Sequence, residues 1–324
     1  MSPCLIDIQD LYTQFMTDKG IVRAVDGVSF SLQAGETMGI VGESGCGKTV
    51  LALSIIHLIP QPPGKIVSGC IIFKGRNLVK FDDAELRDIR GKEISMIFQE
   101  PMTALNPVFR IGDQIAEVYR LHQNLSSREA LQRAVESLRE VGLPAPEKRV
   151  LDYPHQLSGG MRQRVMLAMA MACKPALMLA DEPTTALDVT IQAQILELMD
   201  TLKQQSGMSI LLITHDLGVV AEAAQTVGVM YAGTIVEYTS VYDLFREPLH
   251  PYTIGLMEAV PRIRPRNGTY RLTAIPGSVP TLTSIPTTCR FQDRCGRAME
   301  ICRRQEPQMK EARPLHQVKC WLYN

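Results

Sequence analysis

The sequence predicts an α/β fold built on a mixed, mainly parallel sheet, and three observations support this prediction. Apolar runs with the length of buried strands, at 37–41, 177–179 and 210–213, alternate with segments of helical periodicity. The first run leads into a glycine-rich turn and then a helix, which is the order of a phosphate-binding unit. The composition, with 45% apolar and 21% charged residues, is that of an ordinary globular protein.

The other elements follow along the chain. Apolar residues at every second position in 5–9 and 28–32 predict strands of a half-exposed, antiparallel β subdomain. From about 100 to 172 the pattern is helical, with a capping box at Ser126 and Glu129 that predicts the start of a helix. This stretch therefore predicts a helical insertion in the α/β core.

Length, hydropathy and charge limit the function further. The 324 residues suffice for one large domain and a smaller one, and the longest apolar run, 165–173, is too short to cross a bilayer. No secretory signal is visible, so we expect a protein that stays in the cytosol. Residues 261–324 carry 12 Lys or Arg against 4 Asp or Glu, and the rest carries 22 against 30. This asymmetry predicts a separate basic segment at the C-terminus.

Residues 42–49, Gly-Glu-Ser-Gly-Cys-Gly-Lys-Thr, match the phosphate-binding loop. Its glycines would let backbone N–H groups face the phosphates, Lys48 would reach the β and γ phosphates, and Thr49 would place its hydroxyl on Mg²⁺. The alternative is a glycine turn before an ordinary helix, but the preceding strand and following helix favour the loop. The predicted nucleotide contacts are Gly42, Ser44, Gly45, Cys46, Gly47, Lys48 and Thr49.

Two further polar groups bear on nucleotide chemistry. Asp181 and Glu182 end an apolar strand at the sheet edge where doubly wound folds bind ligands, although a helix cap is the commoner role for such a pair. Ser158, Gly159 and Gly160 precede a helix and would form a second anion site that lacks a lysine and a metal ligand. One complete and one incomplete site predict that two chains dock head to tail.

These motifs resemble those of the ATP-binding subunits of ABC transporters, most closely the dipeptide and oligopeptide importers, along the entire chain. The matching motifs are Walker A at 42–49, the Q-loop at Gln99, the signature at 157–161, Walker B at 177–181, the catalytic glutamate at Glu182, the D-loop at 186–188 and the switch histidine at His215. The resemblance implies a P-loop ABC ATPase core in residues 1–248 and a small Cys-rich C-terminal region in residues 249–324.

The resemblance also implies roles for single residues. Glu182 would polarise the attacking water, His215 would contact the γ-phosphate, and Gln99 would contact the metal and the water. For His215 the alternative is a helix-capping histidine. The implied Mg²⁺ ligands are Thr49, Gln99 and Asp181.

The remaining implied contacts concern adenine and the partner's nucleotide. Phe15 best matches the aromatic ring that stacks on adenine, with Tyr12 as the alternative, and either ring could instead be a core contact. The residues implied at the nucleotide of the paired subunit are Ser158, Gly159, Gly160 and Asp188.

Four cysteines lie within the basic C-terminal segment, separated by 5, 6 and 17 residues. Because disulfides are disfavoured in the cytosol, a metal site is the better interpretation, but the spacing does not decide between zinc, an iron–sulfur cluster and no metal. The resemblance to peptide importers implies a [4Fe-4S] cluster, with Zn²⁺ as the alternative. The expected ligands are Cys289, Cys295, Cys302 and Cys320. The arginines expected to offset the cluster's charge are Arg290, Arg294, Arg297, Arg303 and Arg304.

The resemblance implies an ATPase subunit that energises an ABC importer of di- or oligopeptides, peripherally bound at the cytoplasmic face of the inner membrane. The implied partners are two membrane permease subunits, a second, paralogous ABC ATPase and, indirectly, an extracytoplasmic substrate-binding protein; no nucleic-acid partner is expected. Nickel chelates, glutathione or glycosides are alternative cargoes. A soluble ABC ATPase outside transport and an interaction protein that only senses nucleotide are alternative functions.

Overall fold

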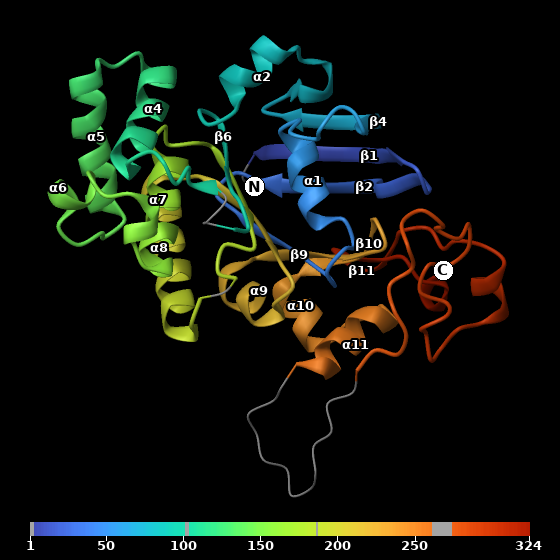
Figure 1. The fold of residues 1–324 in the computed structure, drawn as a ribbon. Helices are drawn as coiled ribbons and strands as arrows, with labels where there is room; N and C mark the ends of the chain where they lie inside the picture. The colour runs from blue at the N-terminus through green and yellow to red at the C-terminus, as the bar shows by residue number, and fades with distance from the viewer. Residues whose placement is uncertain (1–2, 101–103, 186, 261–273) are drawn as a thin grey trace, which may run out of the picture. The chain divides into compact units, whose positions relative to one another are not determined.

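A computed structural model describes residues 3–100, 104–185, 187–260 and 274–324 of the chain (Figure 1). The described residues form two compact units. The first unit comprises the described residues of Met1–Leu5, Leu32–Glu36 and Lys80–Ile213. The second comprises those of Ile6–Ser31, Thr37–Val79 and Thr214–Asn324.

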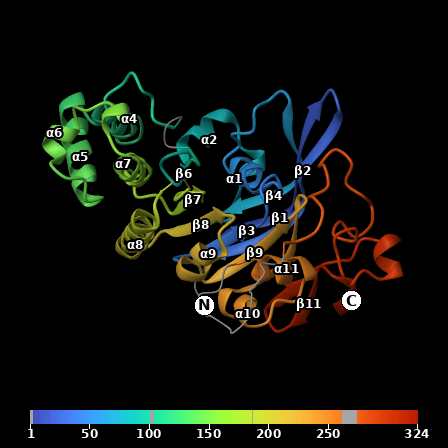
Figure 2. The same ribbon diagram turned by 60° about the horizontal axis from the view of Figure 1, so that its bottom comes forward.

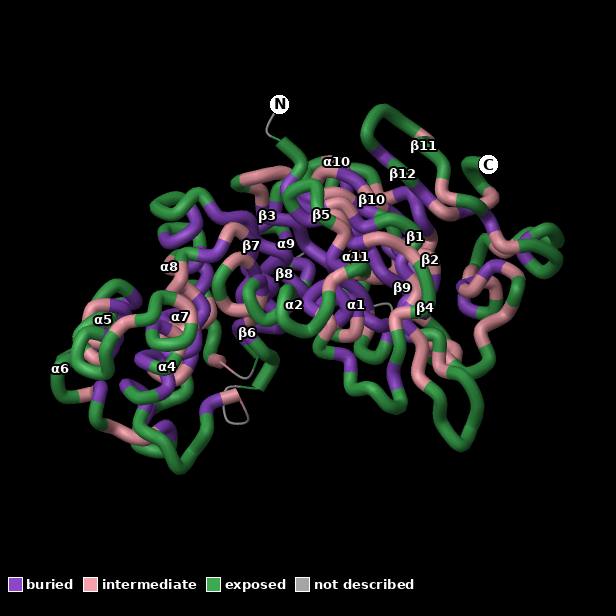
Figure 3. The backbone as a smooth tube through the Cα atoms, turned by 90° about the horizontal axis from the view of Figure 1, so that it is seen from above, coloured by how far each residue is buried: buried purple, intermediate pink, exposed green. Residues whose placement is uncertain are grey.

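The first unit contains three parallel strands, β6 (Ile94–Ile97), β7 (Leu177–Asp181) and β8 (Ser209–Thr214), in the order β8-β7-β6. Every residue of β7 and β8 is buried (Figure 3), which accounts for their continuous apolar sequence. Ile97 of β6 lies opposite Ala180 of β7. The polar residues that follow these two strands are therefore brought to the same sheet edge.

The predicted helical insertion is present in the first unit, where α4, α5 and α7 pack side by side (Figures 1 and 2). The predicted capping box begins α5: Ser126 Oγ accepts from the Glu129 N–H (3.4 Å), and the Glu129 carboxylate accepts from the Ser126 N–H (3.0 Å). Helices of this unit are α2 (Asp83–Ile89), α4 (Ile111–Gln123), α5 (Ser127–Glu140), α6 (Pro146–Arg149), η2 (Pro154–Gln156), α7 (Gly159–Met171) and α8 (Val189–Ser206).

The second unit contains an antiparallel sheet and part of a mixed sheet. The first has the order β2-β1-β4-β5, and β4 is antiparallel to β1 and β5. Its strands are β1 (Cys4–Thr17), β2 (Gly20–Gln33), β4 (Gly64–Phe73) and β5 (Arg76–Asn77). In the order β11-β12-β10-β9-β3, only β3 and β9 are parallel. These strands are β3 (Thr37–Val41), β9 (Thr226–Tyr231), β10 (Thr234–Ser240), β11 (Lys310–Arg313) and β12 (His316–Val318).

The helices of the second unit are short. They include α1 (Lys48–Ile55), α9 (Leu217–Ala223), α10 (Val241–Arg246), α11 (Pro251–Ala259), η3 (Glu300–Arg303) and η4 (Trp321–Tyr323), and η1 (Leu78–Lys80) lies at the boundary of the two units. In the described part of the chain, no helix combines the length and apolar character that crossing a membrane requires.

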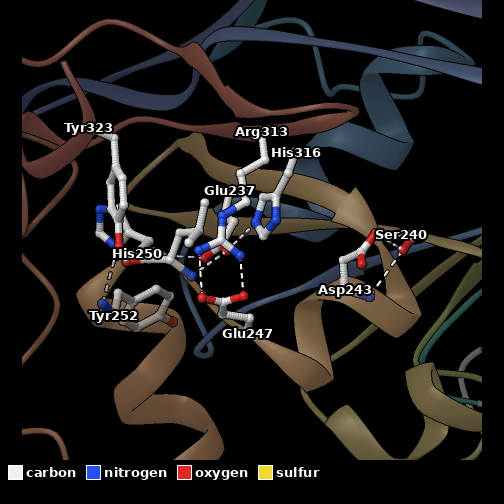
Figure 4. Close-up of polar contacts among 10 residues, drawn as sticks. Glu237, Ser240, Asp243, Glu247, His250, Tyr252, Arg313, His316 and Tyr323 are labelled. Atoms are coloured by element: carbon white, nitrogen blue, oxygen red, sulfur yellow. Dashed lines mark hydrogen bonds and ion pairs between the residues drawn. The ribbon is translucent and has the colours of Figure 1, made fainter.

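The C-terminal segment is attached to the mixed sheet through buried polar contacts (Figure 4). Glu237 of β10 is fully buried and accepts hydrogen bonds from the backbone N–H groups of 249–250 (2.7 and 2.9 Å), and its Oε1 lies 2.7 Å from Nε2 of His316. Burial acts to raise the pKa of Glu237, but these hydrogen bonds outweigh it and lower the pKa. Arg313 of β11 pairs with Glu247 as well. The segment is therefore an integral part of the second unit.

Candidate functional site

The predicted phosphate loop lies in the second unit, between the fully buried β3 and α1. A Cβ atom added at Gly42 would lie 2.1 Å from the carbonyl oxygen of Met230, and one at Gly47 would lie 2.1 Å from that of Ala24. Gly47 also has a φ of 107°, which L side chains rarely adopt. Glycine is therefore required at both positions for the backbone to close into a compact cradle.

Lys48 is directed back across this loop. Its side chain is buried, and Nζ donates to the carbonyl oxygens of Gly42 (2.7 Å) and Glu43 (3.0 Å). These acceptors are neutral, so the ammonium charge at the centre of the loop fits an anion such as a phosphate group. Exposed residues of the loop are Ser44, Gly45 and Thr49.

In the first unit, the ends of β6 and β7 bring two predicted residues together. Glu182 follows β7, is buried, and accepts hydrogen bonds at Oε2 from Gln99 Nε2 and from Thr185 Oγ1, both at 2.9 Å. Asp181, the last residue of β7, is also buried. The sequence interpretation missed Thr185, although a hydroxyl three residues after an acidic group was the available signal. The arrangement holds one carboxylate in a fixed orientation at the sheet edge.

The predicted signature residues lie at the N-terminus of α7. Ser158 is the N-cap, and its Oγ accepts from the Met161 N–H at 3.4 Å. The helix includes Gly159 and Gly160 in its first turn rather than beginning after them, and Ser158 and Gly159 are exposed. A helix of 13 residues with an exposed serine and small residues at its start can accommodate an anion.

His215 and Asp188 have different local surroundings. His215 follows β8 and is exposed, whereas the N-cap of α9 is Asp216, which accepts from the N–H groups of 218–219. The helix-capping alternative therefore belongs to Asp216 and not to His215. Asp188 caps α8 through a hydrogen bond of 3.0 Å, and Ala186 of the predicted D-loop lies outside the described residues.

The two candidate aromatic residues both lie on β1. Phe15 is half-buried and lies opposite Gly64 of β4, where an added Cβ would come within 2.8 Å of the Phe15 ring. Tyr12 similarly covers Gly27, where an added Cβ would lie 3.0 Å from the Tyr12 hydroxyl. Each ring packs over a glycine, and the role of Phe15 at adenine stays a prediction.

Two families of known proteins match parts of this chain. Residues 25–185 match a family described as ABC transporter, and residues 236–302 match one described as oligopeptide/dipeptide transporter, C-terminal region. The probable peptide ABC transporter ATP-binding protein y4tR of Sinorhizobium fredii is 53% identical over 99% of this chain and 95% of its own length. The chain belongs to the ATP-binding subunits of ABC transporters.

Two Bacillus subtilis proteins are also similar to this ABC subunit. The oligopeptide transport ATP-binding protein OppD is 52% identical over 98% of this chain and 88% of its own length. The dipeptide transport ATP-binding protein DppD is 49% identical over 98% of this chain and 94% of its own length. The predicted family is confirmed.

Solved ABC cassettes share the fold of this ABC subunit. The dimeric, post-hydrolysis structure of the ATP-binding cassette MJ0796 bound to ADP and Pi has a TM-score of 0.65 and 27% identity, and covers 73% of this chain and 98% of that chain. A second dimeric structure of the same cassette gives a TM-score of 0.65 and 28% identity. The predicted fold class is confirmed, and the ABC subunit is an ATPase of the class that uses ATP with Mg²⁺.

The predicted [4Fe-4S] cluster is wrong. Among the described residues, which include the four expected ligands, no group of three or more His, Cys, Asp or Glu side chains could hold a metal ion, and the zinc alternative fails on the same finding. Burial raises the pKa of Cys289 and of Cys320 to about 11, and it also raises the pKa of Cys295. Cys289 and Cys302 belong to an apolar cluster that includes Phe291. Cys289 and Cys302 are therefore small core side chains.

Three of the five arginines that were expected to offset a cluster's charge have carboxylate partners, which weakens the charge argument for a cluster. The observed pairs are Arg290 with Asp26 and Glu306, Arg294 with Glu43, and Arg304 with Glu300. Arg297 donates its backbone N–H to Cys295 Sγ at 3.4 Å, and its charge opposes the rise that burial causes in the pKa of that thiol. Arg303 is exposed. Of the five arginines, Arg290, Arg294 and Arg304 therefore pair with carboxylates.

Proposed function

We propose that this ATP-hydrolysing subunit energises the import of di- or oligopeptides. The observation that carries the proposal is the match of residues 236–302 to the C-terminal region of oligopeptide and dipeptide transporters. The names of the relatives, which describe peptide, oligopeptide and dipeptide transport, support the same cargo. A nickel chelate, glutathione or a glycoside would require the same ATPase with a different permease, and these cargoes are outcomes of the test below.

The nucleotide binds at residues 42–49, where the backbone cradle and Lys48 hold its phosphates. Thr49, Gln99 and Asp181 hold Mg²⁺, whose charge supplies neutralisation of the phosphates when it is bound. His215 contacts the γ-phosphate, and the ring of Phe15 stacks on adenine. Buried Lys48 with neutral partners supports the first of these assignments.

Glu182 orients and polarises the attacking water. Its carboxylate is held by Gln99 and Thr185 at 2.9 Å each, which supports a fixed direction for its remaining acceptor positions. Gln99 precedes the helical insertion, so a movement there changes the hydrogen bond on the carboxylate.

A second ABC ATPase, a paralogue of this chain, completes the nucleotide site. Its signature motif covers the nucleotide bound at residues 42–49, while Ser158, Gly159, Gly160 and Asp188 of this chain contact the nucleotide of the paralogue. The exposed N-terminus of α7 supports this reciprocal arrangement.

Two permease subunits bind the helical insertion, and the extracytoplasmic binding protein acts through them. A groove of ≈ 250 Å³ in the first unit supports this contact, with apolar lining residues that include Phe98, Leu105, Val118 and Met169. Phe98, which precedes Gln99, is 42% exposed. An apolar helix of a permease would bind in this groove at the cytoplasmic face of the membrane. Its movement would be transmitted to Gln99 and so to the residues that orient the water.

The test uses the assembled complex with its permeases, its paralogous ATPase and its binding protein. Glu182→Gln should allow ATP-dependent pairing of the ATPases but lower turnover at least about a hundredfold, whereas Glu197→Gln, at an exposed position of α8, should leave turnover unchanged. Normal turnover of Glu182→Gln would defeat the assignment. Stimulation by peptides, but not by glutathione, glycosides or nickel chelates, is expected, and the reverse would refute peptide import. Failure to assemble with permeases would favour a soluble ABC ATPase.

A further inference from the structure

The phosphate loop is held from outside by residues of the C-terminal part of the chain. Both carboxylate oxygens of Glu43, the second residue of the loop, accept hydrogen bonds from Arg294, at 2.8 and 3.0 Å. The backbone N–H of Glu43 donates to the hydroxyl of Tyr252 at 2.9 Å. All three residues belong to the second unit. The loop residue is therefore fixed at its side chain and at its backbone.

Arg294 is itself rigidly placed. Its side chain is 5% exposed, and Nε donates to the carbonyl oxygen of Pro276 at 2.8 Å. Its guanidinium lies 5.7 Å from the ring centre of Tyr231 and 5.9 Å from that of Phe291. The planar guanidinium is thus held by a hydrogen bond at its edge and by aromatic rings at its face, so it can fix a carboxylate in one orientation.

The phosphate loop is also connected to the C-terminal segment at Cys46, through the turn at residues 232–233. Arg290, paired with Asp26 at 2.7 Å, donates through Nη1 to the carbonyl oxygen of Ala232 at 2.7 Å. The next residue, Gly233, donates its N–H to the carbonyl oxygen of Cys46 at 2.9 Å. Arg290 therefore fixes the turn that holds the other side of the phosphate loop.

Charge gives the contact with Glu43 a direct consequence for ligand binding. A carboxylate one residue after Gly42 would repel a phosphate group, because both are anionic at neutral pH. The guanidinium of Arg294 neutralises this carboxylate and binds both of its oxygens. Loss of Arg294 would therefore have two effects at once: the loop would lose a contact that holds it, and the charge of Glu43 would no longer be neutralised.

We propose that Arg294 is a positioning residue for nucleotide binding and that, with Tyr252 and Arg290, it holds the phosphate loop in its binding conformation. The inference rests on the nucleotide-binding role proposed for residues 42–49. It assigns a task to the C-terminal segment that requires no metal: the segment sets the affinity of the loop for the phosphates of a nucleotide.

The test measures nucleotide affinity of the full-length chain by titration with a fluorescent ATP analogue. Arg294→Gln should weaken binding about tenfold, as expected for the loss of a charge-assisted, bidentate contact. Arg294→Lys, which keeps the charge but not the fork, should lie between this variant and the wild type. The matched control is Arg304→Gln, because Arg304 pairs with Glu300 at an exposed position of the same segment; its affinity should stay within about twofold.

A double-mutant cycle separates positioning from general stabilisation. If Arg294 acts through Glu43, Glu43→Gln should reduce the effect of Arg294→Gln, since no carboxylate is left to direct. Hydrogen exchange at the amides of residues 44–48 should be faster in nucleotide-free Arg294→Gln than in the control. Unchanged affinity of Arg294→Gln, or additive effects of the two substitutions, would overturn the inference.

Two further measurements keep the result interpretable. If Arg294→Gln fails to fold, Glu43→Gln removes the same ion pair by changing the loop residue. This variant should show faster hydrogen exchange at residues 44–48, and unchanged exchange would refute the role of the contact. Lys48→Ala tests the nucleotide site itself and should abolish binding. Normal binding by Lys48→Ala would defeat the proposed function, whereas normal binding by Arg294→Gln would defeat only this inference.

Discussion

Buried His250 should make the stability of the second unit depend on pH. His250 is 2% exposed, and its Nδ1 accepts a hydrogen bond of 3.0 Å from the backbone N–H of Tyr252, which requires an unprotonated nitrogen. Burial lowers the pKa of His250 from 6.5 to about 4, against the opposing effect of Glu237. The unfolded chain therefore binds a proton at a higher pH than the folded chain, and acidification favours unfolding.

The size of the effect follows from these two pKa values. The contribution is complete above the unfolded pKa of 6.5 and is lost as the pH falls toward the folded pKa of about 4. Between pH 8 and pH 5 the free energy of unfolding should fall by about 2 kcal/mol, and the total loss should approach about 3 kcal/mol at lower pH. The pKa of Glu237 is lowered in the folded chain, so Glu237 also reduces the free energy of unfolding once the pH falls below the ordinary pKa range of a glutamate. The comparison therefore ends at pH 5.

Urea unfolding followed by tryptophan fluorescence measures this loss. Trp321 is the single tryptophan of the chain, is half-buried in the second unit, and donates through Nε1 to the carbonyl oxygen of Gln305 at 3.0 Å. His250→Asn keeps a capping acceptor without the titration, and His155→Asn changes an exposed histidine of the first unit as a control. The pH dependence should shrink by about 2 kcal/mol in His250→Asn alone. An equal pH dependence in His250→Asn and the wild type would refute the reasoning.

Three further outcomes are expected. Gly47→Ala should abolish nucleotide binding in a titration, because the new Cβ would meet the Ala24 carbonyl oxygen at 2.1 Å; preserved affinity would contradict the cradle. Burial raises the pKa of Cys46, so mass spectrometry should find exposed Cys4 alkylated before Cys46, and the reverse order would contradict this burial. Ser158→Ala should preserve nucleotide binding by the single chain but lower turnover of the paired ATPases about tenfold; full turnover would contradict the role of the signature.

Features determined by local backbone requirements could be predicted from the sequence. The loop at residues 42–49 requires glycine where backbone atoms approach closely, and the start of α5 requires Ser126 and Glu129 because they cap each other's N–H groups. In both cases the physical constraint acts over a few residues. The hydrogen bond between Gln99 and Glu182 was not predicted, because it depends on β6 and β7 being neighbouring parallel strands.

The cysteines of the C-terminal segment show where sequence interpretation failed. A thiol suits a metal ligand and a small buried core position equally well, and four thiols in 32 residues do not distinguish the two. The distinction depends on surroundings that spacing does not encode. In the structure, Cys289 and Cys302 share an apolar cluster with Phe291, and burial raises the pKa of Cys289 to about 11.

The charge pattern contained a signal that became clear only with the fold. Residues 261–324 have an excess of eight positive charges, and the rest of the chain has an equal negative excess. A basic segment alone suggests an external anion, but here Arg290 pairs with Asp26 and Arg294 pairs with Glu43, more than 250 residues away. In the described part of the segment, these two pairs and that of Arg313 with Glu247 join positive charges to carboxylates elsewhere in the chain. Glu43 is the clearest case. The negative charge of an acidic residue inside an anion-binding loop would weaken anion binding, and here Arg294 of the C-terminal segment neutralises that charge.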